Sequence, residues 1–272
     1  MTIINKNDNK YNKILKTRNK NDLFNYLKNR EFNNYLEPYE ETESYELYRH
    51  IEDNIPIEDK AKDLIYIMAL LHNKTTTYEK YGIDDVKDLY EQQKTKIYKI
   101  KEYYYSLHDK IENQIYYYPE EYLLLKNISL VYKLLSKSEE LLEEWYKSQI
   151  KETKVRKCTL HRNLTLKKIK EEDNKIYLID WDNYSKDLVI YDFIIFYKNE
   201  YKILEMTSLY DLYLSKYPLT KTEQLLLYSN LSLPKQVLLN KSHYENTINI
   251  KYLITYATNT LNFISKYDEK NK

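Results

Sequence analysis

The sequence of 272 residues predicts an α+β fold with two lobes, a small one over residues 1–52 and a large, mostly helical one over residues 53–272. Three observations lead to this prediction. Short segments rich in β-branched and aromatic residues flank one amphipathic stretch before residue 52. Apolar residues recur at helical spacing over long stretches after residue 59. Residues 158–182 instead show an alternating segment, a polar turn and a β-branched run, which is the pattern of a β-hairpin.

The elements expected in the small lobe are three strands and one helix. Residues 1–10 are polar, so a frayed end is expected there. The helix has Leu23, Phe24, Tyr26 and Leu27 on its apolar face. The acidic segment Glu40 to Glu43 predicts a turn between the last two strands. The strands are expected at 11–17, 35–38 and 45–51, the helix at 21–32, and a hinge to the large lobe at 53–56.

The large lobe is expected to contain mainly long helices. Pro119 separates two of them, whose apolar stripes predict an antiparallel pair. Thr220 and Glu223 have the spacing of a capping box, which predicts the start of another helix. The remaining helix ranges follow from the 3.6-residue period: 59–72, 83–117, 120–149, 187–199 and 241–266.

Composition excludes several classes of protein. The net charge of +1 gives no overall field that would favour nucleic acid or a membrane surface. Cys158 is the one cysteine, which excludes an internal disulfide and a cysteine-based zinc site. The longest apolar runs, such as 64–71, are too short to span a bilayer, and the polar first residues are unlike a signal peptide. We therefore expect a protein of a reducing cytoplasm.

The segment from His161-Arg162-Asn163 to Leu178-Ile179-Asp180-Trp181 carries a family resemblance. It resembles the catalytic and metal loops of the aminoglycoside/choline kinase-like phosphotransferase superfamily, and within it the bacterial spore-coat kinase-like group. Tyr191-Asp192-Phe193-Ile194 and Leu70-Leu71-His72 are similar to two further segments of that superfamily. The resemblance implies a protein kinase-like fold with a reduced small lobe.

The resemblance also implies roles for individual residues. Asp180, at the end of a strand, would hold Mg²⁺ against nucleotide phosphates, and Asp182 would be a weaker second ligand. The alternative is that both are exposed acids at a strand end or a helix cap. His161 would be an internal hydrogen-bonding residue. Asp192 would brace the backbone of the 161–163 loop, because a carboxylate on an apolar helix face needs donors.

Two positions depart from the family pattern. Asn163 stands where the family has its catalytic Asp, and an amide cannot accept a proton near neutral pH. It can still orient a hydroxyl, and a positioned base typically contributes a factor of ~10²–10⁴ in rate. Lys168 stands where the family has a metal-binding Asn, and its charge opposes a metal. Either it contacts phosphate in place of a second metal, or it points to solvent.

The small lobe offers little to hold a nucleotide. No glycine precedes Gly82, so no glycine-rich loop brings backbone amides to phosphates. Lys13 or Lys16 is the candidate for nucleotide contact, with Glu31 as ionic partner, and solvated side chains are the alternative. Residues 151–170 contain eight Lys or Arg and one acid. This basic stretch either steers an anionic ligand into the site or consists of solvated side chains. No nucleic-acid-binding motif accompanies this stretch.

These observations predict a degenerate pseudokinase that acts by binding, with weak or absent affinity for ATP and Mg²⁺. The alternative is an active ATP-dependent phosphotransferase for a small hydroxylated substrate, in which Asp180 holds the metal. A third interpretation is a helical scaffold or coat-type protein, with a protein partner on the helices of 83–150.

Overall fold

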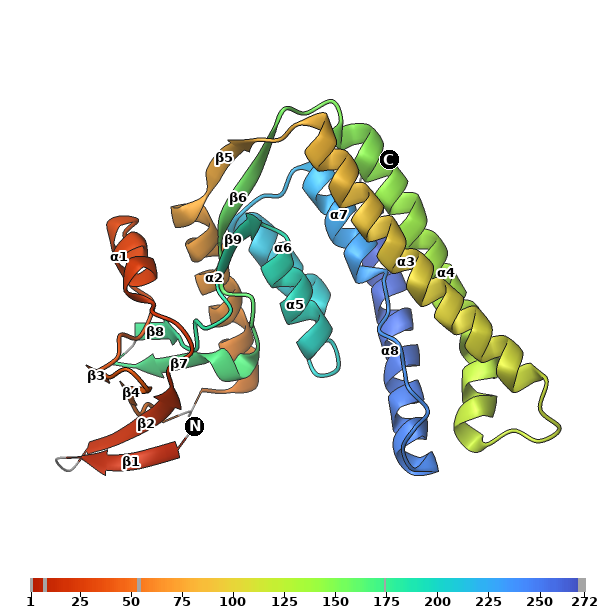
Figure 1. Cartoon of the computed structure of the whole chain (residues 1–272), viewed down its shortest axis with the longest axis horizontal. Coiled ribbons are helices and arrows are strands. Elements are labelled where there is room, and N and C mark those ends of the chain that lie inside the picture. Colours follow the sequence, from red (N-terminus) through yellow and green to blue (C-terminus); the bar gives the residue numbers. More distant parts are fainter. Residues whose placement is uncertain (1, 7–8, 53–54, 174, 269–272) are drawn as a thin grey trace. The chain divides into compact units, whose positions relative to one another are not determined.

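The computed structural model describes residues 2–6, 9–52, 55–173 and 175–268 (Figure 1). The chain forms two compact units. We call one the site unit, made of residues 1–78, 156–196 and 208–218. We call the other the helical unit, made of residues 79–155, 197–207 and 219–272. Within the described residues, no helix combines the length and the apolar character that crossing a membrane requires.

The site unit contains a four-stranded antiparallel sheet in the order β1-β2-β4-β3. Residues 2–6, expected to fray, instead form a strand, because Ile3 and Ile4 lie within a run that pairs with β2 along its whole length. The segment predicted as an acidic turn begins as a strand at Glu40 and Glu41, which pair with β4. The strands are β1 (Thr2–Lys6), β2 (Asn9–Leu15), β3 (Glu40–Glu41) and β4 (Tyr45–Arg49).

Helix α1 (Asn21–Asn29) has the predicted apolar face, with Leu23, Phe24 and Leu27 buried. It ends three residues before the predicted end, where Glu31 takes a left-handed φ of 57°. The strand predicted at 35–38 is reduced to a single parallel bridge between Tyr35 and Leu178. Residues 53–54 of the predicted hinge lie outside the described residues, and Pro56 directly precedes the next helix.

The predicted hairpin of 158–182 is wrong in its extent. β6 (Lys154–Leu160) pairs with β9 (Ser185–Leu188), and the hairpin itself is formed by β7 (Ile169–Glu172) and β8 (Lys175–Leu178). A 3₁₀ turn, η1 (Leu166–Lys168), precedes that hairpin. β6 ends at Leu160, and the loop at 161–165 and this turn separate it from the hairpin.

The remaining elements of the site unit follow from the same pairings. The helix predicted at 187–199 begins later, because residues 185–188 belong to β9. Three strands form a second sheet in the order β5-β6-β9. The elements are α2 (Ile57–Thr75), β5 (Thr77–Lys80), α5 (Tyr191–Glu200) and α6 (Met206–Lys216). β5, β6, α5 and α6 each also include residues of the helical unit.

The helical unit is built on two long helices that lie side by side, as predicted, and are joined by the loop at 113–118 (Figure 1). The Thr220 hydroxyl accepts a hydrogen bond from the Glu223 N–H at 3.2 Å, and the Glu223 carboxylate accepts one from the Thr220 N–H at 2.8 Å. The predicted capping box is therefore confirmed. The helices are α3 (Ile83–Glu112), α4 (Pro119–Gln149), α7 (Lys221–Leu231) and α8 (His243–Asp268).

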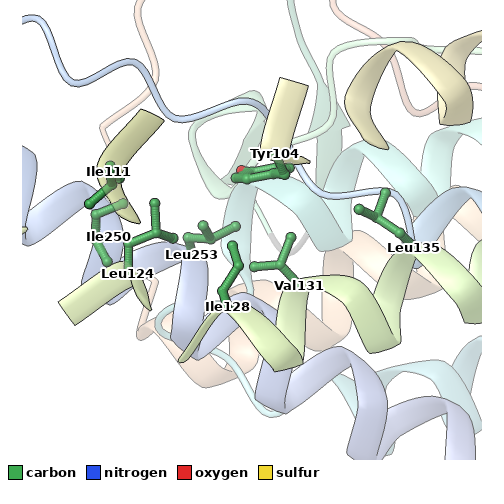
Figure 2. Close-up of a cluster of buried hydrophobic side chains, with 8 residues drawn as sticks. All are labelled: Tyr104, Ile111, Leu124, Ile128, Val131, Leu135, Ile250 and Leu253. Atoms are coloured by element: carbon green, nitrogen blue, oxygen red, sulfur yellow. The ribbon is translucent and has the colours of Figure 1, made fainter. Parts of the chain in front are cut away.

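A cluster of buried side chains joins α3, α4 and α8 (Figure 2). Tyr104 and Ile111 come from α3, and Ile250 and Leu253 come from α8. The α4 members are Leu124, Ile128, Val131 and Leu135, which follow the i, i+4, i+7 spacing of one helix face. Burial of this stripe holds the three helices together, at ~25 cal/mol per Å² of apolar surface.

Candidate functional site

The candidate site lies in the site unit, where two loops come together. The first loop follows β6 and contains His161, Arg162 and Asn163, and the second follows β8 and contains Asp180 and Asp182. The Ile179 N–H donates to the Lys168 carbonyl at 3.0 Å, which continues the β7–β8 pairing to the edge of the site. This bond fixes the start of the second loop, and the His161 side chain joins the first loop to the Ile179 carbonyl.

Asp192 braces the first loop with the geometry expected from the sequence. It is fully buried on α5, and its carboxylate accepts hydrogen bonds from the backbone N–H groups of His161 at 2.8 Å and Arg162 at 2.7 Å. His72 of α2 places Nε2 3.3 Å from Asp192, and its Nδ1 lies 2.9 Å from the Tyr213 hydroxyl. Burial raises the pKa of Asp192, but His72, with smaller contributions from His161 and the Arg162 N–H, more than offsets this, and the pKa is lowered.

His161 is a buried structural residue. Its Nε2 lies 2.9 Å from the Ile179 carbonyl, which can only accept, so Nε2 carries the proton. Its Nδ1 is buried without a hydrogen-bond partner among the described residues, and its ring packs edge-on against Trp181 at 4.8 Å. Burial lowers the pKa of His161, so the ring stays neutral.

We expect His161 to make stability depend on pH. Its pKa is lower in the folded than in the unfolded state, so the unfolded state binds the proton first as pH falls. The stabilisation is fully present above the unfolded pKa of ~6.5 and is lost as pH falls toward the folded pKa. Urea unfolding between pH 7.5 and 5 should show this loss, and His161→Asn, which keeps an N–H donor, should flatten the slope. Equal slopes for both proteins would contradict the assignment.

Asp180, the predicted metal ligand, is bound by two side chains of the protein itself. The Lys168 ammonium forms an ion pair with Asp180 Oδ2, and the Asn163 amide donates to the same oxygen at 3.3 Å. The structure therefore brings these three predicted residues together. Both interpretations of Lys168, a phosphate contact and a solvent-exposed side chain, missed this ion pair with Asp180.

Left-handed backbone angles shape both loops. Arg162 has a φ of 65° and Asp180 has a φ of 66°, a region that residues with a Cβ seldom adopt. Both side chains have partners that hold these turns: Asp180 is paired with Lys168, and Arg162 contacts two neighbouring residues. Its guanidinium lies 3.5 Å from Asp187 and 5.0 Å from the centre of the Tyr191 ring. Such angles cluster at functional sites, where the surrounding contacts hold them.

Asp182 is paired with Lys20, a lysine outside the predicted site residues. Lys20, just before α1, places Nζ 2.7 Å from both Asp182 and Glu46, and the lysine and Glu46 are buried. Burial lowers the pKa of Lys20, but its hydrogen bonds to the two carboxylates raise it overall. For Asp182, burial raises the pKa and the bond to Lys20 lowers it, with a lowered pKa as the result.

The predicted ion pair of Lys16 with Glu31 is wrong. Lys16 lies 2.5 Å from Glu41, and Glu31 lies 2.8 Å from Lys74 on α2. One signal pointed to the real pair: Glu46 lies in a predicted strand among aromatic and apolar residues, where a carboxylate needs a cation. Nothing in the sequence singled out Lys20 as that cation.

Arg18 fastens the segment before α1 to the second loop. Its Nη1 donates to the carbonyls of Asp182 at 3.4 Å and Tyr184 at 3.2 Å. The guanidinium also lies 3.5 Å from the centre of the Tyr184 ring. The second loop is thus held by Arg18 and Lys20 from one side and by the hairpin from the other.

The residues present do not fit Mg²⁺ as they stand. Each candidate acid is already paired with a lysine: Asp180 with Lys168 and Asp182 with Lys20. Among the residues that the structure describes, no group of three or more His, Cys, Asp or Glu side chains is arranged to hold a metal ion. A metal would have to displace a lysine or lie beside its charge, which opposes it.

Known proteins match this chain by structure and not by sequence. No family model matches, and no curated protein matches by sequence. An aminoglycoside phosphotransferase from Alicyclobacillus acidocaldarius subsp. acidocaldarius DSM 446 is 10% identical, with a TM-score of 0.72 over 99% of this chain and 92% of that one. A spectinomycin phosphotransferase in complex with AMP is 14% identical, with a TM-score of 0.58 over 94% of this chain and 88% of that one.

The same spectinomycin phosphotransferase in complex with ADP and spectinomycin gives a TM-score of 0.55 at 13% identity, over 95% of this chain and 88% of that one. The chain therefore has the kinase-like fold of these phosphotransferases, as the resemblance implied. At this level of identity the likeness defines the fold alone.

Proposed function

We propose that this protein is a pseudokinase that acts by binding, with weak affinity for a nucleotide and no requirement for Mg²⁺. The observation that carries the proposal is the ion pair of Lys168 with Asp180, because it neutralises the acid that would otherwise hold the metal. The fold supports a nucleotide as the ligand, since a solved structure of the same fold is a complex with AMP. The Lys168 ammonium has three N–H donors, so it can donate to a phosphate oxygen while it remains paired with Asp180.

Asn163 supports binding without efficient catalysis. Its amide N–H donates to Asp180, and its oxygen can accept a hydrogen bond from a hydroxyl but cannot take the proton. A missing base costs a factor of ~10²–10⁴ in rate. Phosphoryl transfer depends mainly on positioning and charge, so an active phosphotransferase for a small hydroxylated substrate is the alternative.

Calorimetric titration with ATP, in Mg²⁺ and in EDTA, tests the proposal. We expect a dissociation constant in the high micromolar to millimolar range that does not change when Mg²⁺ is removed. In EDTA, Lys168→Met should weaken binding, whereas Lys167→Met, which removes an exposed neighbouring lysine, should not. Binding that requires Mg²⁺, together with phosphate release by the unmodified protein, would establish the active enzyme instead.

Two further expectations belong to this proposal. A protein partner on the helices of 83–150 is favoured by the loop between them, where Ile115 and Tyr116 are 88% and 87% exposed.

A cytoplasmic location accords with the single buried thiol of Cys158. The lobe boundary at residue 52 also stays a prediction.

A further inference from the structure

The helical unit contains a cavity of about 460 Å³ that the proposed nucleotide site does not use. Its walls come from the end of α5 and the residues after it, from the loop at 235–241 and from α8. This volume is within the range of ~300–1,000 Å³ that is typical of small-molecule sites. The cavity is therefore large enough for a ligand of one or two rings.

The charge around the cavity has one sign. Four lysines line it, and none of the described residues that line it is Asp or Glu. The Lys198 ammonium is partly buried and donates to the Leu233 carbonyl at 3.0 Å. The other three lysines are exposed: Lys202, Lys235 and Lys241. Like charges gathered around a cavity repel one another, and an anion between them relieves that repulsion.

Lys198 has a lowered pKa, of which burial is the largest cause and charge repulsion the second. Burial, and then the nearby charges of Lys235 and Lys96, lower the pKa of Lys198 to about 7. Near neutral pH the amine is therefore only partly protonated in the free protein. An anion beside Lys198 favours the charged form, so binding and proton uptake are linked at this residue.

The rest of the wall is mainly aromatic and apolar, with three side-chain amides from Gln236, Asn240 and Asn249. Tyr201 and Tyr256 meet edge to face, with ring centres 5.0 Å apart and an interplanar angle of 81°. Lys202 Nζ lies 3.4 Å from the centre of the Tyr252 ring. Leu253 belongs both to the cavity wall and to the buried cluster of Figure 2, so this wall is continuous with the core.

We propose that this cavity binds a small organic anion with a planar, apolar body. Its carboxylate or phosphate contacts Lys198 and Lys202, and its ring system packs against the tyrosines. Mixed chemistry of this kind, apolar walls with a few charged groups that fix orientation, is typical of ligand sites. The proposal does not depend on nucleotide binding, because all the lining residues belong to the helical unit.

The test uses the full chain and three naphthalene probes in calorimetry at pH 7.5. We expect 2-naphthoate and 1-naphthyl phosphate to bind at least tenfold more tightly than uncharged 2-naphthol. Comparison of the two anions shows which head group the site prefers. Titrations in two buffers of different ionisation enthalpy should show proton uptake on binding, because Lys198 becomes fully protonated.

The variants separate the charges from the apolar wall. Lys198→Met should weaken anion binding by about tenfold or more and remove the proton uptake. Lys202→Met should weaken binding severalfold, and Lys126→Met, an exposed lysine of α4 that does not line the cavity, should have no effect. Should Lys198→Met fail to fold, the Lys202→Met and 2-naphthol comparisons decide the question. Equal binding of naphthoate and naphthol, or no binding of either anion, would overturn the proposal.

Discussion

Lys168→Asn is expected to increase the affinity for ATP with Mg²⁺ by about 100-fold, or roughly 2.7 kcal/mol. The substitution removes the ammonium group from Asp180 and supplies an amide oxygen, a neutral ligand that Mg²⁺ accepts. Two unit charges ~4 Å apart interact by ~4 kcal/mol at an effective dielectric constant of 20. The side chains of Lys168 and Asp180 are 24% and 26% exposed, so we expect less than this full value.

Calorimetry in Mg²⁺ and in EDTA measures this effect. Nucleotide binding to Lys168→Asn should require Mg²⁺, and Lys167→Asn is the matched control that leaves Asp180 paired. Adding Asn163→Asp restores a proton acceptor, but we expect phosphate release to stay at background, because no glycine precedes Gly82 to form a phosphate-holding loop. Unchanged Mg²⁺ dependence in Lys168→Asn would show that the ion pair does not control the site. A rise in phosphate release of ~10²–10⁴ in the double variant would show that only the base and the metal ligand were missing.

Lys20→Met is expected to lower the free energy of unfolding by ~3–5 kcal/mol. Lys20 is 4% exposed and contacts Glu46, which is 1% exposed, so its removal leaves a buried carboxylate without its cation. The Tyr48 hydroxyl still donates to Glu46 at 2.9 Å, but a neutral donor compensates only in part. Asp182 loses the same cation, which frees the second loop on that side.

Urea unfolding at pH 7 measures this loss. Lys16→Met is the matched control, because Lys16 pairs with the partly exposed Glu41. This substitution should lower the free energy of unfolding by no more than ~1 kcal/mol. Glu46→Gln added to Lys20→Met removes the unpaired charge, so the double variant should be less destabilised than the sum of the single changes. A loss of under 1 kcal/mol in Lys20→Met would mean that the buried pair adds little to the fold.

Some of the site could be predicted from the sequence because the signals are local. The Asp192 carboxylate lies within an apolar helical segment, and such a group must find donors, which are the 161–162 backbone N–H groups. Asn163, Lys168 and Asp180 fall at matching places of one motif, and the structure brings them together. The β6–β9 pairing was missed because period-2 patterns show that a strand exists but not which strand is its partner.

The sequence by itself determined every helix except α6, together with the capping box at Thr220 and the hairpin turn, because these depend on residues a few positions apart. Only the tertiary structure decided which charges meet. Lys20 joins Glu46 and Asp182 across 26 and 162 residues, and the chain has 43 basic and 42 acidic residues to choose from. Ion pairs of this separation follow from strand register and loop closure and leave no pattern in the sequence. The tertiary structure therefore also decides that Asp180, the candidate metal ligand, is paired with Lys168.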